Sequence, residues 1–349
     1  MLEAEYRRYN KKLKIKIYSM ITIIFFIALF CLTFDTDVGI FEVMSAIIKY
    51  ISGQELFGEN ITEKKVIIFL RLPRICLAIL AGFGLAVAGM MMQAVTRNFL
   101  VSPFTLGVSS ASAFGASVCI VFGNSTIFFN DFYIIGSAFI AAMISMVVVF
   151  AVVNRIGVTA NSVILVGIAL NYFFSALTAS LQFFAQENKL AAVVQWTFGT
   201  FNRANWDAVI IIGIVLLLCS FCIMKFLLKL NAMANGDDEL VRSLGIDPEK
   251  LRGIIMFLSV LMTATIVSFT GVIGFVGLIA PHMARFIVGN NHKLLFPMTA
   301  AIGAALLLVS DSIGKFILYP VNIPVGIVVS FIGVPIFVNL ILNTRKEDL

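Results

Sequence analysis

Runs of apolar residues long enough to cross a lipid bilayer recur along this whole chain. A transmembrane helix needs about 20 mostly apolar residues in succession, and we predict about ten such spans. Composition agrees, because 60% of the 349 residues are hydrophobic, 13% are charged and the mean hydropathy is +1.02. The sequence therefore predicts one all-α, polytopic membrane domain over residues 1–349. The expected spans are about 15–34, 68–92, 102–123, 132–153, 161–184, 207–228, 251–270, 272–289, 295–315 and 324–343.

Basic residues are unevenly divided between the two ends of these spans. With the N-terminus in the cytoplasm, about two thirds of the 25 Lys and Arg residues fall on that side, as the positive-inside rule requires. We therefore predict both termini in the cytoplasm, with residues 1–14 as a cytoplasmic segment. The basic residues are scattered between apolar runs, so the lipid bilayer is an expected partner and nucleic acid is not. Region 251–289 leaves two arrangements open: two spans joined by a tight turn, or one span and a re-entrant piece.

Two outer loops carry structural signals. In the loop 35–65, residues 38–51 place apolar side chains at helical spacing with Glu42 and Lys49 between them, which predicts an amphipathic helix on the membrane surface. The loop 186–207 contains Trp196 and Trp206. Aromatic residues concentrate at the membrane boundary, so we expect these two to anchor the loop there; a contact with a partner or substrate at the pore mouth is the alternative.

The segment 231–252 is the longest polar stretch on the predicted cytoplasmic side. Asn235-Gly236-Asp237 can begin a helix, acidic residues follow in its first turn, and Gly245 can end it. Acidic residues near a helix N-terminus and a basic residue toward its C-terminus also suit the helix dipole. A short, well-capped helix outside the membrane is a good docking element, and a simple connector is the alternative.

The chain lacks the motifs of an enzyme. It contains no GxxxxGK[ST] phosphate loop, no HExxH, no GxSxG and no carboxylate cluster at metal-ligand spacing. It also lacks the relay of acidic or His residues through the bilayer centre that a proton- or sodium-coupled pump commonly uses. We therefore expect that the chain neither hydrolyses ATP nor cleaves a bond by itself, and that it binds no metal or cofactor of its own. Its energy would come from a gradient or a partner.

A series of short motifs, in a fixed order, links the chain to a known family. They are Arg71-Leu72-Pro73-Arg74, Gly89 to Gln93 with Thr96-Arg97-Asn98, Ser102-Pro103 with Leu106-Gly107-Val108-Ser109, Arg242-Ser243-Leu244-Gly245, Gly274 to Leu278 with Pro281-His282 and Arg285, and Ile323 to Ile327 with Gly333-Val334-Pro335. In these motifs the chain resembles the permeases of iron-siderophore and cobalamin ABC importers, the FecCD family. The resemblance extends over nearly the whole length after the first span.

The resemblance implies a type II ABC importer permease with ten spans and both termini inside. It implies as partners a second permease subunit (in a homo- or heterodimer), two cytoplasmic ABC ATPase subunits that hold ATP and Mg²⁺, and an extracytoplasmic substrate-binding protein. The location would be the cell membrane of a prokaryote. Coupling helices of the family lie between the sixth and seventh spans and contact the ATPase. The matching residues here are Asp238, Glu239, Arg242, Leu244 and Gly245.

Outer arginines of this family receive acidic residues of the binding protein. Arg71 and Arg74 match two of those positions, and Lys315 occupies a third. Lysine keeps the charge there but lacks the bidentate fork of arginine. Some members close an inner gate with small hydroxyl residues before the fifth span. The corresponding residues here are Thr159, Ala160, Asn161 and Ser162.

The function expected from the resemblance is import by alternating access, driven by ATP on partner subunits. A ferric siderophore is the expected substrate, and cobalamin or haem is the first alternative. Two other classes stay open: a secondary transporter without an ATPase, and an intramembrane enzyme. The missing ionisable relay disfavours the secondary transporter, and the missing catalytic constellation disfavours the enzyme.

Overall fold

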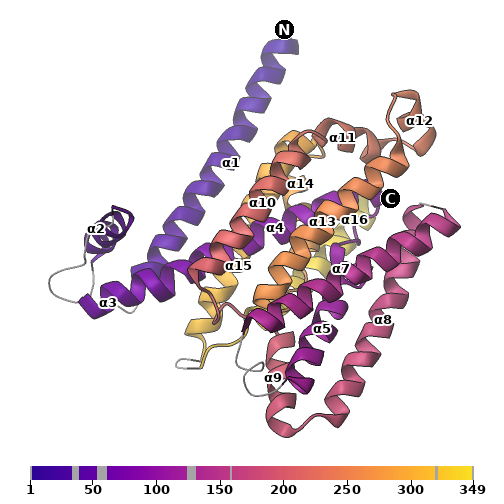
Figure 1. Ribbon diagram of the computed structural model, residues 1–349. Coiled ribbons are helices and arrows are strands. Elements are labelled where there is room, and N and C mark those ends of the chain that lie inside the picture. Colours follow the sequence, from indigo (N-terminus) through magenta and orange to yellow (C-terminus); the bar gives the residue numbers. More distant parts are fainter. Residues whose placement is uncertain are drawn as a thin grey trace.

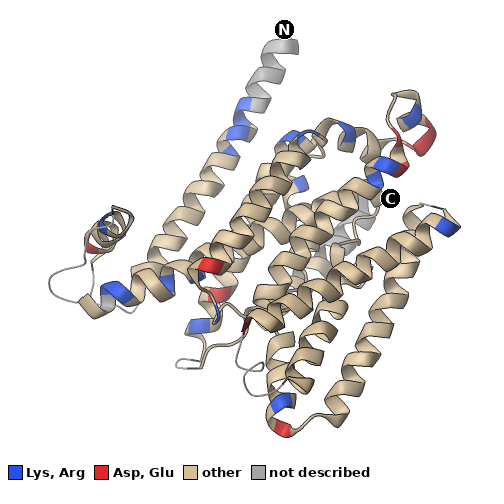
Figure 2. Cartoon of the chain, in the orientation of Figure 1, with Lys and Arg blue, Asp and Glu red and all other residues tan. Residues whose placement is uncertain are grey.

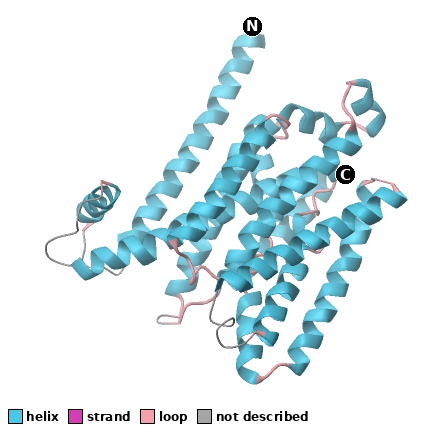
Figure 3. Ribbon diagram, viewed as in Figure 1, coloured by secondary structure: helices cyan, strands magenta, loops and turns pink. Residues whose placement is uncertain are grey.

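The structure is a computed structural model that describes residues 2–33, 39–52, 61–123, 131–157, 159–318 and 321–347. Within these ranges the chain consists of helices joined by loops and turns and contains no strand (Figure 3). Long helices run side by side in a bundle, and shorter ones lie at its two ends (Figure 1).

Seventeen helical elements are described in chain order. The first half contains α1 (Leu2–Thr33), α2 (Ile40–Ile51), α3 (Ile61–Val66), the π-helix η1 (Ile67–Arg71), α4 (Leu72–Thr96), the 3₁₀-helix η2 (Pro103–Leu106), α5 (Val108–Phe122), α7 (Asp131–Ile156) and α8 (Ala160–Phe184). The second half contains α9 (Glu187–Thr197), α10 (Trp206–Met224), α11 (Leu227–Asn235), α12 (Asp238–Ser243), α13 (Pro248–Thr270), α14 (Val276–Val288), α15 (His292–Phe316) and α16 (Val325–Glu347).

Each predicted span coincides with a helix, but the helices differ in length. Seven helical stretches are long and apolar enough to cross a membrane, counted over the described residues. The apolar parts of α5, α14 and α16 are shorter. At 1.5 Å per residue, the 13 residues of α14 extend about 20 Å, less than the roughly 30 Å hydrocarbon layer. In region 251–289 the structure therefore has one full-length helix, α13, followed after residues 271–275 by one that is too short to cross as a straight span.

Helix α4 lies at the centre of the bundle and is buried along most of its length. It meets α15 at the pair Gly82 and Gly303, and α14 at the pair Gly89 and Gly277. A Cβ atom added to Gly82 would overlap the carbonyl of Gly303, and one added to Gly89 would overlap the carbonyl of Gly277. Small residues let membrane helices approach backbone to backbone, so glycine fixes how closely α4 packs against both neighbours.

Of the predictions for the two outer loops, the structure agrees with the helix in loop 35–65 but not with the exposed position of Trp196 in loop 186–207. Helix α2 forms within the predicted 38–51 stretch, and Tyr50 stacks on Trp206 with ring centroids 6.3 Å apart. Its place on a membrane surface stays a prediction, and residues 34–38 and 53–60 of that loop lie outside the described ranges. Trp196 is only 4% exposed and packs in a core cluster with Ile134 and Val193. The expectation that Trp196 is a boundary anchor is therefore wrong, because the α9 helix that carries it turns the ring inward.

The ends of the bundle agree with the predicted arrangement of the cytoplasmic elements. In Figure 1 the N-terminal end of α1 lies toward the same end of the molecule as α11 and α12. We call this the inner end and the opposite end the outer end. The orientation relative to a membrane stays a prediction from the charge distribution.

Replacing Gly89, one of the two contact glycines of α4, tests the close packing of α4 against α14. In Gly89→Ala the new methyl group meets the Gly277 carbonyl. We therefore expect the free energy of unfolding to fall by about 1–3 kcal/mol, as is typical of overpacking. Gly213→Ala in α10 is the matched control, because its Cβ would meet only Leu80 Cδ1 at 3.8 Å. Thermal unfolding in nanodiscs should show a lower Tm for Gly89→Ala and no loss for Gly213→Ala. Equal Tm values for Gly89→Ala and the wild type would contradict the close approach.

Candidate functional site

Charged residues lie mostly toward the ends of the bundle (Figure 2), and three basic ones line a cavity at the outer end. Arg71 and Arg74, three positions apart, and Lys315, far from them in sequence, all line this cavity of about 380 Å³. Among the described residues that line it, none is acidic. We call it the outer cavity. A concave surface lined by three cations attracts negatively charged groups. Its other lining residues are Cys31, Leu70, Phe201, Asn202, Ala204, Ser312, Phe316 and Asn322.

Arg74 is held in place by the buried carboxylate of Asp311. Its Nε and Nη2 donate to Asp311 of α15 at 2.9 and 2.7 Å, and its Nη1 donates to Asn202 Oδ1 at 2.6 Å. The side chains of Arg74 and Asp311 are 14% and 5% exposed. Lys315 Nζ, one helical turn from Asp311, lies 3.2 Å from its Oδ2, the oxygen that also accepts from Arg74 Nε. The four-residue spacing of Asp311 and Lys315 on one helix favours this pair, whereas no local pattern indicates that Arg74 is the closer partner of Asp311.

A local distortion positions the two arginines. The π-helix η1 ends at Arg71, and Pro73 stands in the first turn of α4. Proline has no backbone N–H and its ring clashes with the carbonyl four residues earlier, so a widened turn before it relieves that conflict. Arg71 and Arg74, three positions apart, then face the same cavity.

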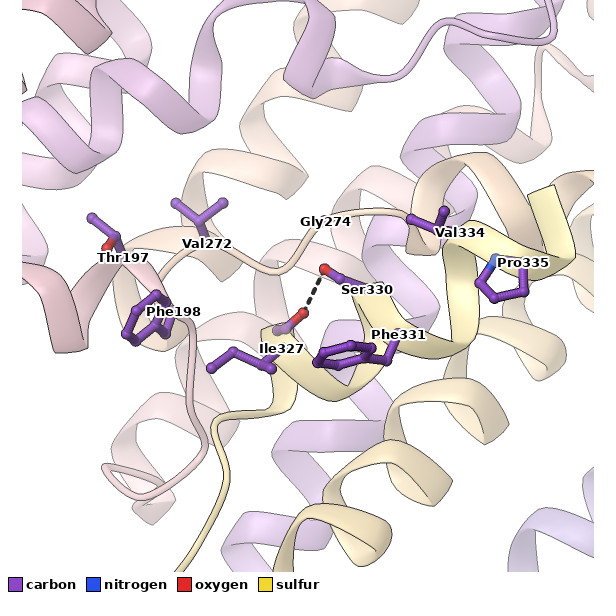
Figure 4. Close-up of a pocket in the computed structure, with 10 residues that line it drawn as sticks. Thr197, Phe198, Val272, Gly274, Ile327, Ser330, Phe331, Val334 and Pro335 are labelled. Carbon is purple, nitrogen blue, oxygen red and sulfur yellow. Dashed lines mark hydrogen bonds between the residues drawn. The ribbon is translucent and has the colours of Figure 1, made fainter. Parts of the chain in front are cut away.

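A second and larger cavity lies between α16 and the loops that precede α10 and α14. It has a volume of about 680 Å³, and we call it the path cavity. Figure 4 shows the side chains of Ile327, Ser330 and Phe331 on α16 across from Thr197 and Phe198. The Ser330 hydroxyl is held by the carbonyl of Gly326 at 2.8 Å. No charged residue is among the described residues of its wall, which also includes Val272, Gly274, Val334 and Pro335.

At the inner end, α12 is fixed to the bundle through Asp238. This carboxylate accepts from Arg97 Nη2 at 2.6 Å and from Arg252 Nη2 at 3.2 Å. Arg97 is the left-handed C-cap of α4 and also donates to the Met233 carbonyl at 2.8 Å. Burial tends to raise the pKa of Asp238, but the hydrogen bond from Arg97 and the charges of Arg252 and Arg97 outweigh it and lower the pKa. Asp238 therefore connects the ends of α4 and α13, and only the remaining predicted coupling residues present their side chains outward.

The remaining residues lie on the exposed side of α12 and in the turn that follows it. Glu239, Arg242, Leu244 and Gly245 are all exposed, and the Leu244 side chain is 59% exposed. Asp237 caps the helix start, and Gly245, with φ +76°, ends it with a bond from its N–H to the Arg242 carbonyl. The predicted start and stop of this helix are confirmed. An exposed leucine on such a rigid projection is suited to a protein contact.

The predicted gate residues form a helix cap. Thr159 is the N-cap of α8, and its Oγ1 accepts from the Ser162 backbone N–H at 3.1 Å. The Ser162 hydroxyl donates to the Gly157 carbonyl at 2.6 Å. Ala160 and Asn161 begin the helix. These hydroxyls satisfy backbone groups at the helix start, and a gate role for the four residues stays a prediction.

Neither the partners of Arg74 nor the lining of the path cavity could be predicted from the sequence. The partners of Arg74 come from α15 and from the segment before α10, and no local pattern brings them together. A lone carboxylate in an apolar helix, as at Asp311, does signal that a buried cation must lie near. The lining of the path cavity was not identified either, although Gly274 and Gly326 stand in motifs noted above.

Proteins with similar sequences are transport permeases. MJ0087 of Methanocaldococcus jannaschii, provisionally named an ABC transporter permease, is 41% identical over 80% of this chain and 82% of its own. The molybdate import permease MolB of Haemophilus influenzae is 34% identical over 82% of this chain and 84% of its own. The iron(3+)-hydroxamate import permease FhuG of Bacillus subtilis is 33% identical over 93% of this chain and 95% of its own.

The fold and the family agree with these relatives. A solved structure described as an inward-facing conformation of a metal-chelate type ABC transporter superposes with a TM-score of 0.81 at 30% identity. The match covers 94% of this chain and 98% of that one. Residues 20–343 match the FecCD transport family. The chain therefore belongs to the FecCD transport family and is a permease subunit of an ABC importer.

Proposed function

We propose that this permease imports a ferric siderophore. The observation that carries the proposal is the path cavity, which is large, apolar and uncharged over its described lining. A bulky chelate presents much apolar surface and needs few fixed polar contacts. A small oxyanion such as molybdate would instead need rings of Arg or Lys along its path.

The proposed assembly places partners at both ends of the bundle. The three cations of the outer cavity support docking of an acidic surface on an extracytoplasmic binding protein. The exposed face of α12 supports contact with one of two ABC ATPases, which hold ATP and Mg²⁺. A second permease subunit would close the path cavity against the exposed side of α16, where the Phe331 side chain is 77% exposed. The location would be the cell membrane of a prokaryote, with both termini inside.

A transport measurement distinguishes the candidate substrates. The permease, its ATPase and its binding protein are reconstituted in proteoliposomes and supplied with ATP. Uptake is compared for radiolabelled ferric hydroxamate siderophore, haem, cobalamin and molybdate. We expect saturable uptake of the siderophore alone. Uptake of molybdate without siderophore uptake would contradict the proposal, and uptake of haem or cobalamin alone would move the substrate to that chelate.

Docking by charge predicts a specific loss on charge reversal. Arg71→Glu and Lys315→Glu place acids against the acidic partner, so each should raise the Kd of the binding protein about tenfold or more, about 1.4 kcal/mol per factor of ten. High salt screens these charges and should therefore reduce the difference in Kd between each variant and the wild type. Lys65→Glu on α3, outside the lining of the outer cavity, is the control. Biolayer interferometry with the complex in nanodiscs measures the Kd, and unchanged values for both cavity variants would contradict this docking face.

Contact through α12 predicts a loss of ATPase binding without unfolding. Leu244→Asp places a charge on an exposed apolar contact, so we expect the ATPase to copurify at less than about a tenth of the wild-type yield, since central apolar contacts dominate binding energies. Leu244→Met keeps the volume and should bind normally. Asp238→Ala, in contrast, removes the anchor of the helix and should lower thermal stability as well, because the buried Arg252 guanidinium loses one of its acceptors. Full ATPase recovery with Leu244→Asp would place the contact elsewhere.

A further inference from the structure

The segment between α9 and α10, residues 198–205, forms part of the wall of both cavities. Phe198, at its start, lines the path cavity. Asn202 and Ala204, a few residues on, line the outer cavity beside Arg71 and Arg74. A change at one cavity can therefore reach the other through a few residues of backbone. We call residues 198–205 the linking segment.

The first part of the linking segment is held tightly. The Thr200 N–H donates to the Thr270 carbonyl at 2.7 Å. Gly199 adopts a left-handed conformation with φ +65°, and a Cβ there would overlap the Val272 carbonyl. On the other side, a Cβ on Gly326 would overlap the Phe198 carbonyl. Backbone packed this closely against α13 and α16 moves with them and not independently of them.

In the second part, Phe201 is buried in the core and Arg203 lies 3.7 Å from Asp131, whereas Asn202 is held by a side-chain contact with Arg74. Asp311 takes the Nε and Nη2 edge of the guanidinium, so Nη1 remains for another acceptor, and Asn202 Oδ1 accepts from it at 2.6 Å. Asn202 is also held in its turn by a bond from its N–H to the Thr200 hydroxyl at 3.1 Å. A further cavity of about 80 Å³, lined by Trp196, Asn202 and Thr270 among others, lies against this turn and leaves room for it to shift.

We propose that Asn202 is the positioning residue that couples docking at the outer cavity to the path cavity. This inference rests on the proposed docking of an acidic binding protein. An incoming carboxylate accepts from Arg74 Nη1 more strongly than a neutral amide oxygen does, because charge-assisted hydrogen bonds are the stronger ones. Arg74 itself stays in place, since Asp311 continues to hold its other edge. Asn202 is released, and the linking segment can then shift together with the ends of α13 and α16 that it packs against, which changes the wall of the path cavity.

Two variants of Asn202 have opposite expected effects. Asn202→Ala removes the acceptor, so the segment is released without a docked partner: basal ATPase activity of the complex should rise severalfold, and the loaded binding protein should add little. Asn202→Asp replaces the amide with a carboxylate that binds Arg74 more tightly, so basal activity should fall and stimulation should require more binding protein. Asn188→Ala, at an exposed position of α9 outside the lining of both cavities, leaves the Arg74–Asn202 bond intact and should behave as wild type.

The readout separates coupling from docking and from folding. For Asn202→Ala the Kd of the binding protein, measured by biolayer interferometry, should not rise above the wild-type value, since Arg71, Arg74 and Lys315 still supply the docking charge and the acceptor that competes for Arg74 Nη1 is gone. A merely structural role would lower thermal stability and activity in both Asn202 variants, with no difference in sign. Asn202→Ala and Asn202→Asp both stimulated as wild type would overturn the coupling. A wild-type complex that the loaded binding protein fails to stimulate would instead overturn the proposed function.

A labelling measurement tests the movement itself. In a complex whose permease has its five cysteines replaced by alanine, Thr197→Cys places one thiol in the wall of the path cavity. A water-soluble maleimide should label it faster when the loaded binding protein is docked. With Asn202→Ala in addition, labelling should be fast in the absence of binding protein. If the labelling rate depends on the binding protein in the same way in the Asn202→Ala variant as with Asn202 intact, the release of the linking segment is contradicted.

Discussion

Backbone contact between α4 and its neighbours is the constraint on which the remaining structure depends. Glycine pairs let α4 lie directly against α14 and α15, so the helix has little freedom to tilt without moving them. Each end of α4 is then tied by an ion pair to an element that is distant in sequence. Arg74 binds Asp311 at the outer end, and Arg97 binds Asp238 at the inner end. The 25 residues of α4 extend about 37 Å, so one closely packed helix connects the outer cavity to α12.

The two ion pairs differ in what they do for the protein. Arg74 and Asp311 are nearly buried, and breaking such a pair by removing one partner costs about 3–5 kcal/mol, because the other charge is left without compensation. Arg97 and Asp238 are about a third exposed, where a pair contributes little to stability. Their value lies in orientation: together with the buried Arg252 they fix α12 at a set angle to the bundle. A movement of α12 imposed from outside would thus be transmitted to α4 and α13 rather than absorbed by a loose loop.

The sequence predicted local features well and long-range contacts poorly. The apolar runs located the helices, and Asp237 and Gly245 located the ends of α12, because capping and periodicity are local properties of the chain. The length of α14 and the inward turn of Trp196 were not evident, because neighbouring elements decide them. The family motifs indicated Arg71, Arg74 and Lys315, and the structure brings them to one cavity. Neither the engagement of Arg74 by Asp311 and Asn202 nor the inward role of Asp238 could be read from spacing, since the partners lie 237, 128 and 141 residues away.

The central claim is that partner subunits drive import through this permease with ATP. The most direct test is siderophore uptake by proteoliposomes that contain the whole complex, with ionophores added to collapse the proton and sodium gradients. The account predicts that uptake continues when both gradients are abolished and stops when ATP is removed. Uptake that stops with the ionophores and continues without ATP would contradict it and would identify the protein as a secondary transporter.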